Sequence, residues 1–289
     1  MFYYDFKITG LLLRVASPFP LANFFELDHY KLEYCPDDKP DALYSIKMLP
    51  RDWSVRGELI REERQTAVYE WQGEHHRYYF WSVHTKARYV LLTYRLDDLR
   101  RYTIYLQEDG LEDLLRQFRL SAFFALEQLL LHHSAFQLHS SVVEWRGMGI
   151  LFSAPSGTGK STQAELWRTL EGAQIINGDR AMIRKMREKY VVYGSPYAGT
   201  SGIYTNLSVP IRAIVILSQA AENRLERLEL TAAFGKLYRE STIPSWDVSF
   251  VEKISELIID LIGTVPVYHL ACRPDAGAVE VLKQELINE

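Results

Sequence analysis

Hydrophobic and polar residues alternate over much of the first third of the chain. Residues 4–8 have the period of two that is expected of a strand with one buried face. Apolar runs on either side of the Gln72-Gly73-Glu74 turn, at 68–81, predict a hairpin, and further strands are expected at 89–94 and 102–106. Residues 1–110 are therefore predicted to form a β-rich N-terminal domain. Its dense aromatic residues suit either the faces of a sheet or a substrate-docking surface, and alternation alone leaves both interpretations open.

The period changes after Gly110. Leucine and phenylalanine recur every three or four residues over 111–133, which predicts one long helix. We assign residues 111–136 to a connecting segment that contains this helix. The remaining residues, 137–289, are then expected to form a second domain.

Strands and helices alternate in the second domain, which predicts an α/β core within a chain that is α+β overall. Two adjacent strands with a tight turn at Arg146-Gly147 lead into residues 150–162. The apolar run 211–217 resembles a buried strand and leads into Ser218-Gln219, without an acid. Residues 195–209 lack a period and suit either an ordered loop or a mobile lid. Other predicted elements are helices at 163–170, 228–239, 251–261 and 276–288, and strands at 173–177, 182–186, 190–193 and 265–271.

Residues 150–162 carry the most specific signal in the sequence. An apolar run is followed by a glycine-containing loop, then by Lys160, Ser161 and a helix-forming segment. The phosphate-loop pattern G-x-x-x-x-G-K-[ST] is matched except at its first glycine, where Ala154 stands. Backbone N–H groups in such a loop bind phosphate oxygens, helped by the helix N-terminus. The predicted nucleotide-binding residues are Pro155, Ser156, Gly157, Thr158, Gly159, Lys160, Ser161 and Thr162.

A phosphate loop also needs an acid for its metal or its acceptor. Asp179 ends the next predicted strand, nineteen residues after Lys160. It could hold Mg²⁺ together with the Ser161 hydroxyl, or accept the proton of an attacking hydroxyl, and the sequence does not separate these roles. His139 precedes the strands that deliver the loop and is a second catalytic candidate. Arg180 could neutralise charge on a transferred phosphoryl group, or be an ordinary surface cation.

Composition and charge limit the number of domains, the partners and the compartment that can be expected. The chain has 289 residues, enough for two domains or one large one, and 47% hydrophobic and 24% charged residues are typical of a soluble globular protein. A formal charge of −4 gives no reason to expect nucleic-acid binding. Cys35 and Cys272 are the only cysteines and indicate neither a disulfide framework nor a thiolate metal site. Without a signal peptide or membrane segment in the pattern, a cytoplasmic protein is expected.

Three segments resemble the HPr kinase/phosphorylase family: Leu138-His139-Ser140-Ser141, Phe152 to Thr162, and Ile176-Asn177-Gly178-Asp179. The resemblance covers roughly residues 137–219 and none of residues 1–110. It implies a phosphate-loop core shared with ATP-dependent phosphoenolpyruvate carboxykinase, with ATP and Mg²⁺ as cofactors. It also implies that His139 is the active-site histidine and that Asp179 is the second member of an acidic pair. Gly178 stands where the first acid, the usual base, would be.

Two further departures separate the chain from a true HPr kinase. The loop ends in Lys-Ser-Thr, where that enzyme has Lys-Ser-Glu, and its downstream phosphorylase signature is not apparent. The chain resembles more nearly the HPr-kinase-like proteins encoded beside lasso-peptide precursors, which phosphorylate a C-terminal serine. This resemblance implies a peptide serine kinase with a precursor peptide or small protein as its partner. The alternatives are an HPr-type kinase/phosphorylase, a small-molecule kinase or carboxykinase-like enzyme, and a nucleotide-binding regulator without turnover.

Overall fold

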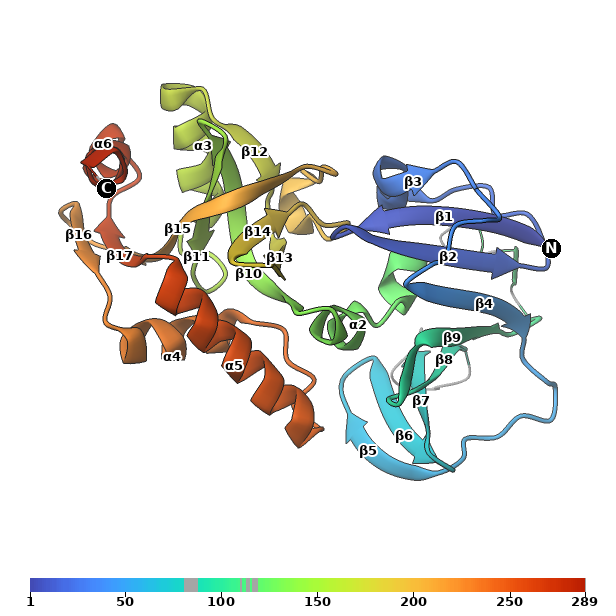
Figure 1. Cartoon of the computed structure of the whole chain (residues 1–289). Coiled ribbons are helices and arrows are strands. Elements are labelled where there is room, and N and C mark those ends of the chain that lie inside the picture. The colour runs from blue at the N-terminus through green and yellow to red at the C-terminus, as the bar shows by residue number, and fades with distance from the viewer. Residues whose placement is uncertain (81–87, 110, 113–114, 116–118, 289) are drawn as a thin grey trace. The chain divides into compact units, whose positions relative to one another are not determined.

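The structure is a computed structural model that describes residues 1–80, 88–109, 111–112, 115 and 119–288. The chain divides into two compact units, Met1–Leu129 and Leu130–Glu289, and both contain large β-sheets (Figure 1). The architecture is therefore mixed α/β and rich in strands. Each unit is described by itself.

The first unit is built on a nine-stranded sheet with the order β3-β1-β2-β4-β9-β8-β7-β6-β5. The predicted hairpin is confirmed: β6 pairs with β7, and positive φ angles at Gln72 (52°) and Gly73 (76°) give the two-residue turn that suits twisted antiparallel strands. The strands are β1 (Phe2–Ile8), β2 (Leu11–Ser17), β3 (Lys31–Leu32), β4 (Ala42–Met48), β5 (Glu58–Glu62), β6 (Thr66–Trp71), β7 (Glu74–Phe80), β8 (Tyr89–Arg95) and β9 (Asp98–Leu106).

The single helix expected over 111–133 is interrupted. A 3₁₀ turn, η2 (Leu120–Phe123), is followed by Ala125, whose φ of 45° cannot continue a right-handed helix. The α-helix proper is α2 (Leu126–His132). Residues 110, 113–114 and 116–118 lie outside the described residues, so the beginning of the expected helix stays a prediction. One more 3₁₀ helix, η1 (Phe25–Tyr30), was not expected.

The second unit contains eight strands, and two long ones change partners along their length. The first half of β10 (Ala135–Trp145) pairs with β13, whereas its second half pairs with β11 and β12. Likewise β15 (Ser208–Gln219) pairs first with β14 and then runs parallel to β11 and β17. The other strands are β11 (Met148–Ser153), β12 (Gln174–Asn177), β13 (Arg180–Met186), β14 (Lys189–Tyr193), β16 (Arg224–Arg227) and β17 (Val267–Cys272).

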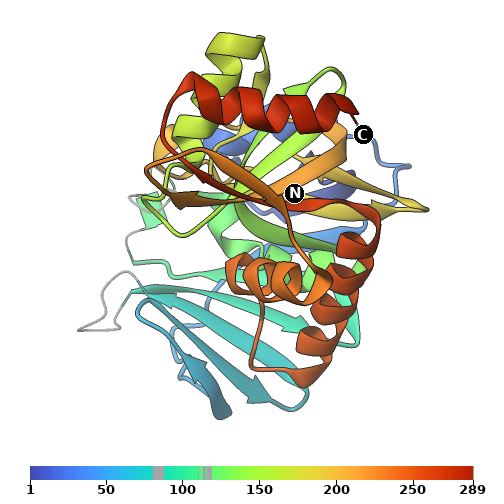
Figure 2. The ribbon, with the colours of Figure 1, turned by 90° about the vertical axis from the view of Figure 1, so that its left-hand side faces the viewer.

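Helices cover both faces of the sheet that contains β11, β15 and β17 (Figure 2). On one face α3 and α6 pack against an apolar cluster that includes Val215 and Leu217 of β15. On the opposite face lie α4 and α5, so the alternate residues Ile216 and Ser218 point toward that side. The bounds are α3 (Lys160–Glu171), α4 (Leu230–Glu240), α5 (Val248–Thr264) and α6 (Ala276–Asn288).

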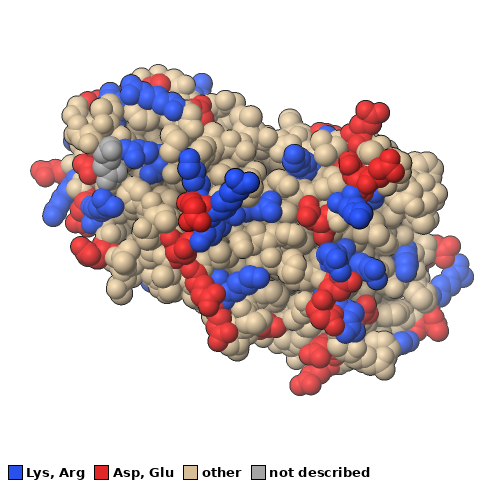
Figure 3. Space-filling model, in the orientation of Figure 1, with Lys and Arg blue, Asp and Glu red and all other residues tan. Residues whose placement is uncertain are grey.

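Two surface properties bear on the expected partners. Basic and acidic side chains are interspersed on the face shown in Figure 3, with no large area of one sign. Within the described part of the chain, the structure contains no helix that combines the length and the apolar character needed to cross a membrane.

Candidate active site

The strand, loop and helix expected around Lys160 are present in the second unit. β11 ends at Ser153 and α3 begins at Lys160, with the loop of residues 154–159 between them. Gly157 and Gly159 have φ angles of 80° and 124°, which a side chain would strain. Ala154 is buried without a positive φ, so the pattern's first glycine is dispensable here. The loop and the N-terminus of a 12-residue helix thus present backbone N–H groups at one place.

Lys160 lies under the loop. The residue is almost fully buried, at 6% exposed, and Nζ donates hydrogen bonds to the carbonyl oxygens of Ala154 (2.8 Å) and Pro155 (3.3 Å). Burial lowers the pKa of Lys160, and the negative charges of Glu240 and Asp179 oppose this shift. A buried ammonium that donates to two neutral carbonyls is suited to an incoming anion.

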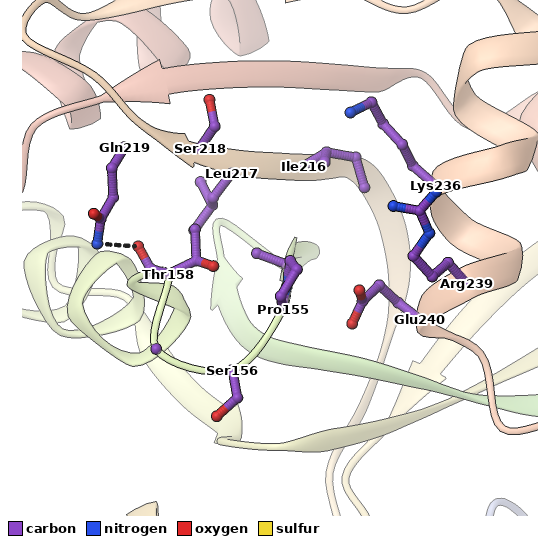
Figure 4. A pocket seen from close by; sticks show the side chains of 12 residues that line it. Pro155, Ser156, Thr158, Ile216, Leu217, Ser218, Gln219, Lys236, Arg239 and Glu240 are labelled. Carbon is purple, nitrogen blue, oxygen red and sulfur yellow. Dashed lines mark hydrogen bonds between the residues drawn. The ribbon is translucent and has the colours of Figure 1, made fainter.

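A cavity of about 470 Å³ opens beside the loop on the side of α4 (Figure 4). Its walls are residues 154–158 of the loop, residues 216–219 of β15, and Lys236, Arg239 and Glu240 of α4. A second hollow of about 410 Å³ borders the other side of the loop and the start of α3, and Arg273 and Pro274 form its far wall. Both hollows lie at the carboxyl ends of the parallel strands β11, β15 and β17, the usual ligand-binding edge of such sheets.

His139 bridges two carboxylates at this edge. Its Nε2 lies 3.3 Å from Asp179 Oδ1, and its Nδ1 lies 2.9 Å from Glu240 Oε2. All three side chains are partly buried, with 13% to 30% of their surface exposed. Since Asp179 and Glu240 also act on the pKa of Lys160, the ammonium, the imidazole and both carboxylates belong to one site. The structure therefore places Lys160, the predicted phosphate-binding cation, near the two catalytic candidates Asp179 and His139.

Local turns fix the position of Asp179. Asn177 Oδ1 accepts hydrogen bonds from the backbone N–H groups of Asp179 (3.1 Å) and Arg180 (2.9 Å), and Ser140 N donates to Asp179 O (2.8 Å). These bonds hold Asp179 next to the strand that carries His139. Arg180 donates to Thr242 Oγ1 (2.8 Å), and its Nε lies 3.8 Å from Asp179 Oδ2. Arg180 therefore borders the site, and its guanidinium is also bound by Thr242, which follows α4.

Nothing in the sequence pattern indicated Glu240, Lys236 or Arg239. The helix predicted over 228–239 contains Lys236 and Arg239 and stops one residue before Glu240. Charged residues on an amphipathic helix are usually solvated, and no motif marks these three. Their spacing of three and four residues places them on one face of α4, and only the packing of α4 brings that face to the loop.

The residues present fit a magnesium nucleotide. The described residues contain no group of three or more His, Cys, Asp or Glu side chains that could hold a metal ion by themselves. Mg²⁺ in nucleotide sites needs one or two protein oxygens, because phosphates and waters fill the other positions. Ser161 is exposed in the first turn of α3, and Asp179 is partly exposed, so both remain the predicted ligands.

Comparisons with known proteins add little to this geometry. No family model matches the chain, and no curated protein matches it. Among solved structures, the chain is similar to the Hpr(Ser) kinase/phosphatase from Coxiella burnetii, with 11% sequence identity and a TM-score of 0.30. The match covers 53% of this chain and 93% of that chain. A likeness of this size carries no conclusion about activity, so function is inferred from the side chains of the site.

Residues 194–207 form an ordered loop against the site. Asn177 Nδ2 donates to the carbonyl oxygens of Ser195 (3.1 Å) and Tyr197 (3.3 Å), and Thr205 Oγ1 donates to Ile176 O (3.0 Å). Within this loop, the 3₁₀ turn η3 (Gly199–Ser201) packs directly on Asp179. A Cβ added at Gly199 would lie 2.7 Å from Asp179 Cγ. These hydrogen bonds attach the loop to the strand that carries Asn177, and its predicted range ends early because β15 begins at Ser208.

The turn at 199–201 also explains why position 178 is a glycine. A Cβ at position 178 would lie 1.9 Å from Ser201 Oγ and 2.5 Å from Ser201 Cβ. Ser201 is fixed in place, because its hydroxyl donates to Ala198 O (2.6 Å) and accepts from Ile203 N (3.2 Å). A side chain at position 178 therefore has no room here, and Glu240 is the second carboxylate of the site.

We expect Gly178→Asp to lower the free energy of unfolding by about 1–3 kcal/mol, the usual range for overpacking. Chemical denaturation of the purified variant measures this. Gly263→Ala in α5 is the control, since nothing beyond its own helix lies within 4 Å of the added methyl group. Adding Ser201→Gly should recover part of the loss. A Gly178→Asp variant as stable as the wild type would show that the turn at 199–201 does not exclude a side chain.

Proposed function

We propose that the protein is an ATP- and Mg²⁺-dependent phosphotransferase that transfers the γ-phosphoryl group to a serine hydroxyl of a peptide. The observation that carries this proposal is a glycine loop with a buried lysine beneath it, next to a cavity that the Asp179–His139–Glu240 array reaches through Glu240. Phosphoryl transfer requires chiefly positioning and charge neutralisation, and these groups supply both.

In this proposal the terminal phosphates bind between the loop and α4. The backbone N–H groups of residues 155–162 and the Lys160 ammonium bind phosphate oxygens. Lys236 and Arg239, on the opposite wall of the same cavity, neutralise charge on the transferred group. The hollow bordered by Arg273 and Pro274 accepts the nucleoside. When bound through Ser161 and Asp179, Mg²⁺ would neutralise the phosphates further.

Asp179 is the proposed general base. It accepts the proton of the acceptor serine while the serine oxygen bonds to the γ-phosphorus and the bond to the departing ADP oxygen breaks. His139 holds Asp179 at Oδ1 and is itself held by Glu240. His139 therefore orients the base Asp179, and Glu240 orients His139.

The acceptor in this proposal is a precursor peptide, as the sequence resemblance to lasso-peptide precursor kinases implies. The first unit is a candidate docking domain: it contains a hollow of about 380 Å³ lined by aromatic and charged side chains, including Trp53, Tyr89, Arg51 and Glu108. The ordered loop at 194–207 is a candidate cover for the acceptor. One observation favours a second candidate, a nucleotide-binding regulator, because Gly178 leaves no room for the first acid of the family's pair.

Incubation with γ-labelled ATP, Mg²⁺ and serine peptides tests the proposal. We expect label on a peptide serine, and its loss in both Asp179→Asn and Lys160→Ala. Saturable ATP binding without transfer to any peptide or protein would contradict the enzyme and support the regulator. Transfer to a folded protein such as HPr, but to no peptide, would show that the substrate is a protein and not a peptide.

Glu240 offers a separate test of the array. We expect Glu240→Gln to lower kcat by about 10- to 100-fold, since a hydrogen bond to a charged group contributes about 1.5–3 kcal/mol. ATP affinity should not fall, because the variant removes a negative charge from the phosphate cavity. Steady-state kinetics and ATP titration measure both. The control is Glu252→Gln on the exposed face of α5. An unchanged kcat would remove Glu240 from the mechanism.

A further inference from the structure

A second array of serine, histidine and acid lies on three neighbouring strands of the second unit. Ser218 Oγ of β15 lies 2.8 Å from His269 Nε2 of β17. His269 Nδ1 lies 3.0 Å from Glu226 Oε1 of β16. None of these residues belongs to the Asp179–His139–Glu240 array. The serine lies in the wall of the cavity between the loop at 154–158 and α4 (Figure 4).

Strand register builds this array. β15 and β17 run in parallel with Ile216 opposite His269, so Ser218, two residues further on, shares a face with His269. β16 and β17 are antiparallel with Glu226 directly opposite His269, which places both side chains on that face too. The imidazole is therefore held between the serine and the glutamate by backbone pairing on both sides.

The hydrogen bonds indicate which atom of each pair donates and which accepts. The bond from His269 lowers the pKa of Glu226, so this carboxylate is ionised at neutral pH and accepts from Nδ1–H. Nε2 of the neutral ring is then an acceptor, and the Ser218 hydroxyl donates to it. A nucleophile bonded to a base, with the base oriented by a third group, is the arrangement that activates a serine.

We propose that Ser218 is a phosphoryl acceptor within the protein itself, with His269 as its base. Ser218 Oγ bonds to the γ-phosphorus of ATP, the bond to the ADP oxygen breaks, and the serine proton moves to His269 Nε2. Phosphoryl transfer is favoured over acyl transfer because the cavity that Ser218 lines is also bounded by the loop at 154–158 and by Lys236 and Arg239. This inference rests on the proposed binding of ATP in that cavity.

The test is site-resolved mass spectrometry of the full-length protein after incubation with ATP and Mg²⁺, with a serine peptide present in the same reaction. We expect phosphate on Ser218 of the wild type and none at position 218 of Ser218→Ala. In His269→Gln the rate of Ser218 phosphorylation should be at least about 100-fold lower. The control is Ser255→Ala, whose hydroxyl donates to a helical carbonyl, that of Val251. ATP affinity and the melting temperature, measured for His269→Gln, separate loss of the base from loss of the fold.

The outcomes distinguish this inference from the proposed peptide kinase. A peptide that is phosphorylated while Ser218 stays unmodified overturns the inference and leaves the kinase intact. Phosphate on Ser218 without phosphate on any peptide supports the inference and contradicts the peptide substrate. If ATP binds and neither serine is modified, both are wrong.

Discussion

Asp179→Asn is expected to lower kcat for phosphoryl transfer by about 10²- to 10⁴-fold, the range for loss of a general base. Asparagine keeps the size of the side chain, but it cannot accept the serine proton. The turn that positions residue 179 uses backbone groups and Asn177, so the fold should be retained. Single-turnover kinetics with labelled ATP measure the chemical step directly.

The matched control for this variant is Asp97→Asn, which changes an exposed carboxylate paired with Arg95 in the first unit. It should leave the rate of transfer unchanged. If Asp179→Asn retains more than about a tenth of the wild-type rate, Asp179 is not the base, because a positioned base contributes at least about 100-fold.

Lys160→Ala is expected to lower ATP affinity and turnover together, by about 10²- to 10⁴-fold overall. The ammonium is the buried cation beneath the loop, and two hydrogen bonds to phosphate oxygens contribute about 1.5–3 kcal/mol each. Isothermal titration with ATP and Mg²⁺ measures the affinity. Lys189→Ala, at an exposed position, is the control. ATP binding of wild-type strength in Lys160→Ala would place the phosphates elsewhere.

The same variant should lose ATP affinity without losing stability in the absence of nucleotide. Burial lowers the pKa of Lys160, so the folded protein binds this proton more weakly than the unfolded chain does. The charged form therefore disfavours folding below the lowered pKa, and this effect disappears as the pH rises above the ordinary value. Without nucleotide, Lys160→Ala should be at least as stable as the wild type, whereas the stabilisation by ATP should be lost. Thermal unfolding with and without ATP checks both.

The sequence was sufficient to predict the elements that local pattern determines. The hairpin at Gln72-Gly73, the turn at Arg146-Gly147 and the strand–loop–helix ending at Lys160 depend on neighbouring residues, and all are present. Strand β16 was missed because its four residues, Arg-Leu-Glu-Arg, lack the apolar alternation of a half-buried strand. The break at Ala125 was missed because leucine spacing continues across it.

The site itself depends on contacts between residues far apart in the chain. His139 and Glu240 are separated by 101 residues, and Ser218 and His269 by 51. Their proximity follows from strand register and from the packing of α4, neither of which leaves a signature in residue spacing. The exclusion of a side chain at Gly178 likewise depends on Ser201, in a loop whose conformation the pattern left open.

The most direct measurement of the central claim is a crystal structure of the protein with a non-hydrolysable ATP analogue and Mg²⁺. We expect the β- and γ-phosphates between the loop at 154–159 and α4, with Lys160 on their oxygens and the Asp179 carboxylate facing the γ-phosphate. A nucleotide bound at another place, or phosphates in this cavity with Asp179 turned away from them, would contradict the account.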